Sequence, residues 1–321
     1  MLEDLKKKLP GLKENEPLAS HTTFKIGGPA KFYYPANNSD ELLKAVKAAD
    51  FFGLPYAIIG WGSNLIVADA GYDGLVIKLN SDNYTIDGNE ITAEAGLNLS
   101  RLVGAASQAG LTGLEFAVGI PGTVGGAAIG NAGAFGQSFG DLVKSVEIYD
   151  NGKVRKISRE KMNYGYRESA YKHSAAVILS VTISLKQGNA KTIGEKMMEI
   201  ISARKNLPYE PSAGCIFKNI NLDEIKFDHG RVLKELEISE DEWKKITSHG
   251  KLPVAYIIDR LGMKGEVIGG CRISDKHCAF FVNDGECKAE HVMMLISKVK
   301  MKVRNQLGIQ LQEEVKYLGF E

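Results

Sequence analysis

Two glycines stand one residue apart after an apolar run, in the segment Gly60-Trp-Gly-Ser-Asn64. Glycine adopts positive φ angles at little cost, so successive backbone N–H groups of such a segment can point at a single anion. A pyrophosphate group suits a nest of this kind. Two glycines after a strand also make an ordinary tight turn, so the segment alone leaves both interpretations open.

A denser segment runs from Gly119 to Gly133 and holds six glycines and one proline in fifteen residues. It has neither strand alternation nor a helical stripe, and we interpret its glycine density as close approach of the backbone to a flat ligand. Neither segment matches the G-x-G-x-x-G fingerprint or the G-x-x-x-x-G-K-[ST] loop. A nucleotide-binding scaffold other than the Rossmann or P-loop type is therefore indicated.

The four cysteines all lie in the last third of the chain, and no pair has the C-x-x-C spacing of a zinc site. In a reducing compartment they are expected to be free thiols. A single cysteine is most often a small buried apolar residue. The cysteines are Cys215, Cys271, Cys278 and Cys287.

Helical spacing of apolar residues predicts a helix over 39–52, with Ser39 as its expected cap. Gly53 and Pro55 then break the helix and lead into a buried strand over 56–60. The first glycine segment therefore begins where a strand ends.

The rest of the chain also mixes helices and strands. Alternation is clearest over 177–185, and a final strand from Ile309 to Tyr317 has Glu314 on its polar face. A domain boundary is expected near Pro208. Further strands are expected over 75–79, 84–87, 90–95, 143–149 and 153–157, and further helices over 99–109, up to about 206, and over 288–307.

The 321 residues carry 40 basic and 39 acidic side chains, a formal net charge of +1. Such a balance provides no overall field for nucleic acid or an anionic membrane. The N-terminal stretch lacks the apolar core of an export signal, and no apolar run is long enough to span a bilayer. These features predict a cytoplasmic protein with neither nucleic acid nor membrane as a partner.

Six segments stand in order along the chain: Thr23-Phe-Lys-Ile-Gly-Gly-Pro-Ala30, Gly60 to Asn64, Gly119 to Ala127, Tyr164-Gly-Tyr-Arg-Glu-Ser169, Pro211-Ser-Ala-Gly-Cys-Ile-Phe-Lys-Asn219 and Leu311-Gln-Glu-Glu-Val-Lys316. In order and spacing they resemble the UDP-N-acetylenolpyruvoylglucosamine reductases of bacterial cell-wall synthesis, within the FAD-binding fold of the vanillyl-alcohol oxidase superfamily. The resemblance covers nearly the whole chain.

The resemblance implies an α/β (α+β) fold, with a two-lobed FAD-binding part and a C-terminal α/β substrate-binding domain. Its lobes are expected over 1–79 and 80–206, the substrate domain over 207–308, and a strand returning to the active site over 309–321. The charged segment 221–251 has no family motif and is interpreted as an insertion. The stretch between Arg167 and the strand that begins at Val177 has no room for the extra substrate-closing insert of the longer form of the family. The resemblance is therefore to the shorter form, and how the UDP diphosphate is held is left open.

The implied reaction uses NADPH to reduce FAD, which then reduces the enolpyruvyl ether of UDP-N-acetylglucosamine. Arg167 matches the family arginine, and a guanidinium can grip a carboxylate with two parallel bonds. Cys215 stands where most members carry a proton-donating serine, and a thiol with a pKa of about 8.5 can replace it. Glu314 matches the family carboxylate, and its neighbour Glu313 is the competing candidate.

The resemblance also implies binding residues. Substrate contacts are expected from Tyr166, Asn219 and Lys264. Residues expected to bind FAD are Gly60, Trp61, Gly62, Ser63, Asn64, Leu65, Gly119, Ile120, Pro121, Gly122, Thr123, Val124, Gly125, Gly126, Ala127, Asn131 and Gly133. The ranges 55–64 and 115–135 contain neither histidine nor cysteine, so the flavin is expected to be non-covalent. NADPH is expected to share the substrate's site, which implies ping-pong binding.

Two other functions fit parts of the pattern. A flavin oxidase of the wider superfamily would need the same two glycine segments. A non-catalytic nucleotide-binding protein would need them too, but it would have no use for the arginine, thiol and carboxylate in these motifs.

Overall fold

The computed structural model describes residues 1–320, which divide into two compact units. The chain passes back and forth between the units, so each of them is built from three separate stretches. The first unit contains Met1–Glu16, Ala30–Trp61 and Asp73–Lys205, and the second contains Pro17–Pro29, Gly62–Tyr72 and 206–320. Both of the expected flavin lobes contribute to the first unit, and the second unit recruits two early segments in addition to the C-terminal part.

A four-stranded sheet opens the first unit, in the order β1 (Lys13–Pro17), β2 (Pro29–Ala36), β5 (Tyr72–Leu79) and β3 (Tyr56–Ile59). Strands β3 and β5 are parallel, so both carboxyl ends lie at the same edge. The first glycine segment leaves this edge directly after β3.

Helix α2 (Ser39–Phe52) has the predicted bounds. The expected cap was wrong by one residue, because the side chain of Asn38, and not that of Ser39, accepts the hydrogen bond from the Glu41 amide. Asn38 is extended whereas Ser39 is already helical, and an N-cap requires non-helical backbone. The helix ends at Gly53, whose φ of 62° is left-handed.

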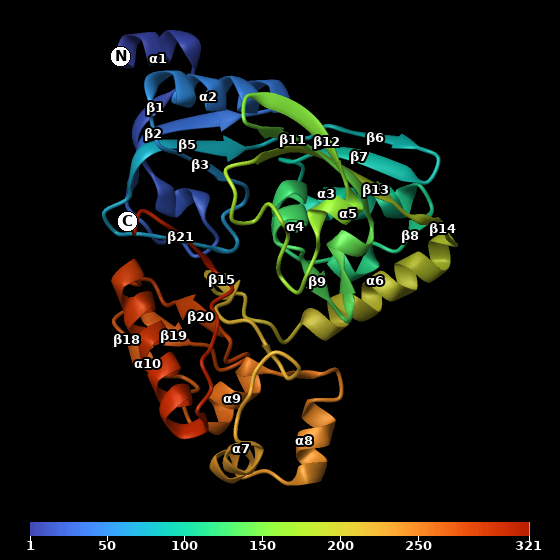
Figure 1. The fold of residues 1–321 in the computed structure, drawn as a ribbon, viewed down its shortest axis with the longest axis vertical. Coiled ribbons are helices and arrows are strands. Elements are labelled where there is room, and N and C mark those ends of the chain that lie inside the picture. The colour runs from blue at the N-terminus through green and yellow to red at the C-terminus, as the bar shows by residue number, and fades with distance from the viewer. Residues whose placement is uncertain (321) are drawn as a thin grey trace. The chain divides into compact units, whose positions relative to one another are not determined.

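The second sheet of this unit is antiparallel throughout, in the order β12 (Lys153–Ser158), β11 (Val143–Asp150), β13 (Val177–Ser184), β7 (Glu90–Glu94) and β6 (Tyr84–Asp87) (Figure 1). The strands expected over 84–87, 90–95, 143–149 and 153–157 are confirmed, and they form the two hairpins β6–β7 and β11–β12. The predicted strand at 177–185 is also confirmed, with its polar members only half-buried. Helices α3 (Leu99–Gln108) and α6 (Ala190–Arg204) pack against each other beside this sheet.

The second unit holds a four-stranded sheet in the order β15 (Ser212–Cys215), β20 (Phe280–Asn283), β19 (Cys271–Ile273) and β18 (Val267–Ile268). Helix α10 (Ala289–Leu307) ends at Gly308 as predicted. The core of the unit is apolar and includes Phe24 and Ile66 from the early segments.

The charged segment 221–251 folds into helices α7 (His229–Leu236) and α8 (Glu240–Ile246). Their apolar faces contribute Val232, Leu236 and Trp243 to the core of the second unit. These contacts give the segment a structural role despite its charge.

The predicted final strand was wrong in extent. Only β21 (Lys316–Leu318) is regular, and it pairs in parallel with β4 (Leu65–Val67). The preceding residues contact a different neighbour, through a bridge between Phe217 and Glu313. A segment that changes partners in this way cannot form one continuous ladder, although burial still alternates from Ile309 to Gln312.

The remaining elements are short, with seven residues at most. They are α1 (Leu2–Lys8), η1 (Leu18–His21), β8 (Leu111–Thr112), η2 (Glu115–Ala117), α4 (Val124–Ile129), β9 (Gly133–Ala134), β10 (Gln137–Ser138), η3 (Phe139–Asp141), α5 (Arg159–Met162), β14 (Lys186–Gln187), β16 (Ile220–Asn221), β17 (Lys251–Leu252) and α9 (Val254–Arg260). Of the helices in the described part of the chain, none combines the length and the apolar composition needed to cross a bilayer.

Candidate active site

The two glycine segments meet within the first unit. A Cβ atom placed on Gly60 would lie only 2.6 Å from Oγ1 of Thr123, so no larger residue fits without a shift of the second segment. Lys78 donates a 2.6 Å hydrogen bond from Nζ to the carbonyl oxygen of Gly60 and holds the start of the first segment. The two glycine segments are therefore held in close contact within the first unit.

The later part of the first segment belongs to the second unit. Gly62 has a φ of 64°, and a Cβ atom there would lie 2.6 Å from the carbonyl oxygen of His21. Its own carbonyl oxygen accepts a hydrogen bond from the amide of Thr23, at 3.3 Å. Asn64 donates a 3.1 Å hydrogen bond from Nδ2 to the carbonyl oxygen of Glu314. The first glycine segment thus borders the expected catalytic glutamate.

In the second segment, Thr123 caps helix α4 by accepting a 3.3 Å hydrogen bond from the amide of Gly126. A Cβ atom on Gly125 would lie 2.8 Å from Cβ of Ala95, and Gly122 has a φ of 144°. Part of the glycine density therefore comes from close packing of the protein on itself, and not from a ligand alone. Capping and packing hold the segment in one conformation.

Exposure separates residues that can face a ligand from those that support the segments. Five of the residues expected to bind the cofactor are exposed: Trp61, Asn64, Gly119, Pro121 and Gly126. Six are buried: Gly62, Thr123, Val124, Gly125, Ala127 and Asn131. The other six, Gly60, Ser63, Leu65, Ile120, Gly122 and Gly133, are half-buried.

Asn131 connects the second segment to the arginine motif. Its Nδ2 donates a 2.7 Å hydrogen bond to the carbonyl oxygen of Gly165, and its Oδ1 accepts one of 2.9 Å from the amide of Gly140. Both functional groups of this buried side chain are thus engaged by the protein. Asn131 therefore supports the second segment from within, through its hydrogen bonds to Gly165 and Gly140.

Arg167 stands in the first unit on a tight turn, between the mutual backbone hydrogen bonds of Gly165 and Glu168. Its φ of 58° is unusual for a residue with a side chain. Its Nη2 donates a 2.8 Å hydrogen bond to the carbonyl oxygen of Gly133, and its guanidinium carbon lies 5.3 Å from the ring centre of Tyr166. The strained turn and these two contacts hold the cation at the end of the second glycine segment.

Cys215 and Glu314 come together in the second unit on neighbouring backbone segments. The amide of Glu314 donates a 2.7 Å hydrogen bond to the carbonyl oxygen of Ile216. The antiparallel contact continues with the bridge between Phe217 and Glu313. Both Cys215 and Glu314 are half-buried, so each retains some access to solvent.

The competing carboxylate is already engaged. Glu313 accepts a 2.6 Å hydrogen bond from Nζ of Lys300 and a 2.5 Å hydrogen bond from the hydroxyl of Tyr317. Burial, and then the Glu313 carboxylate, raise the pKa of Tyr317 well above its usual value. This network gives Glu313 a structural role in the second unit.

The other expected substrate residues differ in their surroundings. Asn219 accepts a 3.1 Å hydrogen bond at Oδ1 from the amide of Val254 and so fixes the start of α9. Lys264 is exposed, with its Nζ 4.0 Å from a carboxylate oxygen of Asp259. Tyr166 faces the guanidinium of Arg167.

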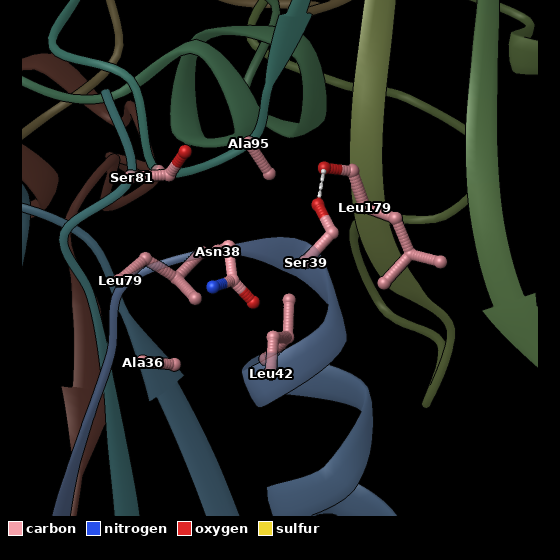
Figure 2. Close-up of a pocket in the computed structure, with 9 residues that line it drawn as sticks. Ala36, Asn38, Ser39, Leu42, Leu79, Ser81, Ala95 and Leu179 are labelled. Atoms are coloured by element: carbon pink, nitrogen blue, oxygen red, sulfur yellow. Dashed lines mark hydrogen bonds between the residues drawn. The ribbon is translucent and has the colours of Figure 1, made fainter. Parts of the chain in front are cut away.

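A hollow in the first unit lies at the start of α2, where Ser39 donates a 3.0 Å hydrogen bond to the carbonyl oxygen of Leu179 (Figure 2). It is too narrow to admit a water molecule, so it is a packing gap and not a nucleotide site. Its lining residues are Ala36, Asn38, Ser39, Leu42, Leu79, Ser81, Ala95, Gly96 and Leu179.

Two positively charged residues near the glycine segments were missed in the sequence. Lys78 holds Gly60, and Arg204 packs its side chain against Gly119. Neither stands in a recognisable motif, because the contacts join residues far apart in the chain. The unpaired Nε of Arg204 is suited to an anionic ligand and fits the phosphates of a nucleotide cofactor beside this segment.

Two family models match the chain, one in its N-terminal half and one in its C-terminal part. The family model described as FAD binding domain matches residues 29–158, which include both glycine segments. The model described as UDP-N-acetylenolpyruvoylglucosamine reductase, C-terminal domain, matches residues 206–318. Together they confirm the expected mixed α/β fold, with a flavin-binding domain followed by a C-terminal domain.

Relatives of known function match nearly the full chain. The UDP-N-acetylenolpyruvoylglucosamine reductase of Caldanaerobacter subterraneus is 36% identical over 314 residues, covering 95% of this chain and 93% of its own. The reductase of Solibacter usitatus is 35% identical over 306 residues, covering 94% and 95%. The crystal structure of the reductase from Thermus caldophilus superposes with a TM-score of 0.74 at 31% identity, covering 96% of this chain and 98% of the other.

These matches decide against the oxidase and the non-catalytic binding protein. The chain belongs to the UDP-N-acetylenolpyruvoylglucosamine reductase family, and it is an FAD-dependent oxidoreductase of peptidoglycan precursor synthesis.

Proposed function

We propose that the chain uses NADPH, through non-covalently bound FAD, to reduce UDP-N-acetyl-3-O-enolpyruvylglucosamine to UDP-N-acetylmuramate. The observation that supports this best is the hydrogen bond from the Glu314 amide to the Ile216 carbonyl oxygen, beside Cys215. It gives a thiol and a carboxylate a common backbone support, and Asn64 of the first glycine segment borders the same glutamate.

The two glycine segments would hold the cofactor through their exposed members, and Thr123 would support the second segment by capping α4. FAD, when bound, supplies the two-electron carrier that the reduction of a carbon–carbon double bond requires. The close contact between Gly60 and Thr123 supports one joint site for the cofactor.

Arg167 would bind the substrate carboxylate. Negative charge develops next to this carboxylate when hydride reaches the enolpyruvyl group, and a fixed cation stabilises such charge. A guanidinium that is already hydrogen-bonded to Gly133 needs little reorganisation to do this. Tyr166 would line the same side of the substrate, next to the arginine.

Cys215 would hold the proton at Sγ that completes the reduction. The electron pair left on the carbon next to the carboxylate takes this proton, and the resulting thiolate is reprotonated from water. Glu314 would polarise the substrate or assist the proton transfer. Serine is the residue that most of the family uses, and a thiol is the stronger acid.

Several finer points belong to the same proposal. Asn219 and Lys264 are proposed to contact the substrate, and NADPH is proposed to occupy the substrate's site in turn. The division into lobes at 1–79 and 80–206, a substrate domain at 207–308 and a terminal segment at 309–321 is proposed as the functional organisation. The cytoplasm is the proposed location, because the four cysteines are free thiols.

A spectroscopic experiment tests the proposal. Purified protein should be yellow and should release its flavin when denatured. Under anaerobic conditions NADPH should bleach the flavin, and the enolpyruvyl sugar should restore the colour whereas UDP-N-acetylglucosamine should not. Bleaching by NADH but not NADPH, or flavin that stays with the denatured chain, would contradict it.

A further inference from the structure

Arg204 is the last residue of α6, and its side chain lies against the first glycine of the second segment. A Cβ atom on Gly119 would lie 3.2 Å from Cδ of Arg204 and 3.9 Å from its Nε. Gly119 has a φ of 74° and is exposed. Because Gly119 has no side chain, the aliphatic part of the Arg204 side chain can pack against the segment at this position.

The Nε atom of Arg204 is buried and has no hydrogen-bond partner among residues 1–320. Its guanidinium carbon lies 5.6 Å from the ring centre of Phe135, a residue with a φ of 52° and 56% exposure. Burial lowers the pKa of Arg204, because no partner compensates the lost hydration. Buried donors are rarely left unpaired in proteins, and such exceptions call for an explanation.

Other arginines of the same unit are paired. Nε of Arg159 donates a 2.8 Å hydrogen bond to the carbonyl oxygen of Gly140, and Arg155 forms an ion pair with Asp150. Arg167 donates to the carbonyl oxygen of Gly133. Arg204 differs from these arginines, because its Nε has no hydrogen-bond partner and lies beside a segment expected to bind the cofactor. This difference indicates that Nε donates to a bound ligand.

A phosphate oxygen suits this donor best. Guanidinium groups bind phosphates through directed, charge-assisted hydrogen bonds, and contact with the ring of Phe135 can hold the planar group in position. We propose that Arg204 is a phosphate-binding residue that donates from Nε to a diphosphate oxygen at the edge of the second glycine segment. The diphosphate belongs either to FAD or to the nucleotide substrates, and the proposal rests on the cofactor site of the proposed function.

Three full-length variants test this. Arg204→Gln removes the cation, Arg204→Lys keeps the charge without Nε, and Arg155→Gln is the control, since it removes an exposed arginine of the same unit. Far-ultraviolet circular dichroism and thermal melting establish that each variant is folded. Flavin fluorescence on serial dilution of the holoenzyme then gives the Kd for FAD, and protein reconstituted with riboflavin gives the Kd without phosphates.

If the FAD diphosphate is the ligand, Arg204→Gln raises the Kd for FAD at least about tenfold and leaves the Kd for riboflavin unchanged. Arg204→Lys falls between the glutamine variant and wild type. If the substrate diphosphate is the ligand, the FAD value stays constant. The Kd for UDP, measured by perturbation of the flavin spectrum in the holoenzyme, then rises by a similar factor.

Two outcomes would overturn the proposal. Equal weakening of FAD and riboflavin would mean that Arg204 only shapes the turn between the paired strands β9 and β10 through Phe135. No change in any of the three affinities would mean that it binds no phosphate. Either result would leave the proposed function intact, since wild-type holoenzyme would still contain FAD and react with NADPH.

Discussion

The backbone amide of Glu314 donates a 2.7 Å hydrogen bond to the carbonyl oxygen of Ile216, the residue that follows Cys215. The proposed acid and its neighbouring carboxylate are therefore fixed by main-chain pairing, and only their side chains can adjust. Ile216 is also held on its other side, because its amide donates to the carbonyl oxygen of Ala279. Rigid support of this kind keeps reactive groups in a productive geometry.

Replacing Cys215 by alanine should slow reoxidation of the reduced flavin by the enolpyruvyl sugar roughly 10²–10⁴-fold, because the proton donor is lost. Flavin reduction by NADPH should be unaffected. Stopped-flow absorbance of the two half-reactions provides the measurement, and Cys215→Ser should remain well above the alanine variant. Equal loss in both half-reactions would refute the role.

Glu314→Gln and Glu313→Gln form a matched pair. The first should lower the rate of the substrate half-reaction about 10²-fold with little change in stability. The second should lower stability by about 1–3 kcal/mol and leave the rate nearly unchanged, because Glu313 accepts hydrogen bonds from Lys300 and Tyr317. Urea titrations and single-turnover rates of both variants check this, and a reversed pattern would assign the chemistry to Glu313.

Arg167→Lys should reduce the substrate half-reaction about 10²-fold, since an ammonium cannot reproduce two parallel bonds to a carboxylate. Reduction of the flavin by NADPH serves as the internal reference. Arg159→Lys is the external control, because that arginine also donates to a glycine carbonyl oxygen in the first unit but has no proposed chemical role. The hypothesis fails if both variants lose the same activity.

Gly60→Ala should destabilise the protein by about 1–3 kcal/mol and weaken FAD binding, because its Cβ atom would lie 2.6 Å from Oγ1 of Thr123. Adding Thr123→Ala should restore part of the affinity by removing that atom. Gly194→Ala in α6 has open space at Cβ and should be neutral or stabilising. Denaturant titrations with flavin fluorescence distinguish these outcomes, and an additive double variant would argue against the contact.

The pH dependence of stability should carry a contribution from Cys278. Burial raises the pKa of this thiol to about 11. In the unfolded chain it is about 8.5, so the folded protein retains the proton over this interval and the unfolded chain does not. The stabilisation is full below pH 8.5 and is lost as the pH rises toward 11. Urea midpoints of wild type and Cys278→Ala between pH 8 and 10.5 should converge, and parallel curves would contradict the prediction.

Local patterns predicted much of the fold. The bounds of α2, the alternation of β13 and the end of α10 at Gly308 follow from periodicity and capping, which involve neighbouring residues. The cap of α2 was misplaced by one residue because Asn38 and Ser39 are both good caps, and only the backbone angles distinguish them.

Long-range contacts could not be predicted in this way. The final strand is interrupted because its residues pair first with the segment after Cys215 and then with β4. The approach of Arg204 to Gly119 joins residues with no common motif. The family motifs pointed to Arg167, Cys215 and Glu314, but not to the carbonyl oxygens of Gly133 and Ile216 that anchor the arginine and the glutamate.

The parallel pairing of β4 with β21 bears on how the polypeptide is made. Leu65 leaves the ribosome about 250 residues before its partner Lys316, a delay of roughly 12–50 s at typical rates of translation. Throughout that interval Ile66 lacks the later residues that bury it, and β4 has an unpaired edge. Nascent chains should therefore recruit chaperones until synthesis of the second unit is nearly finished.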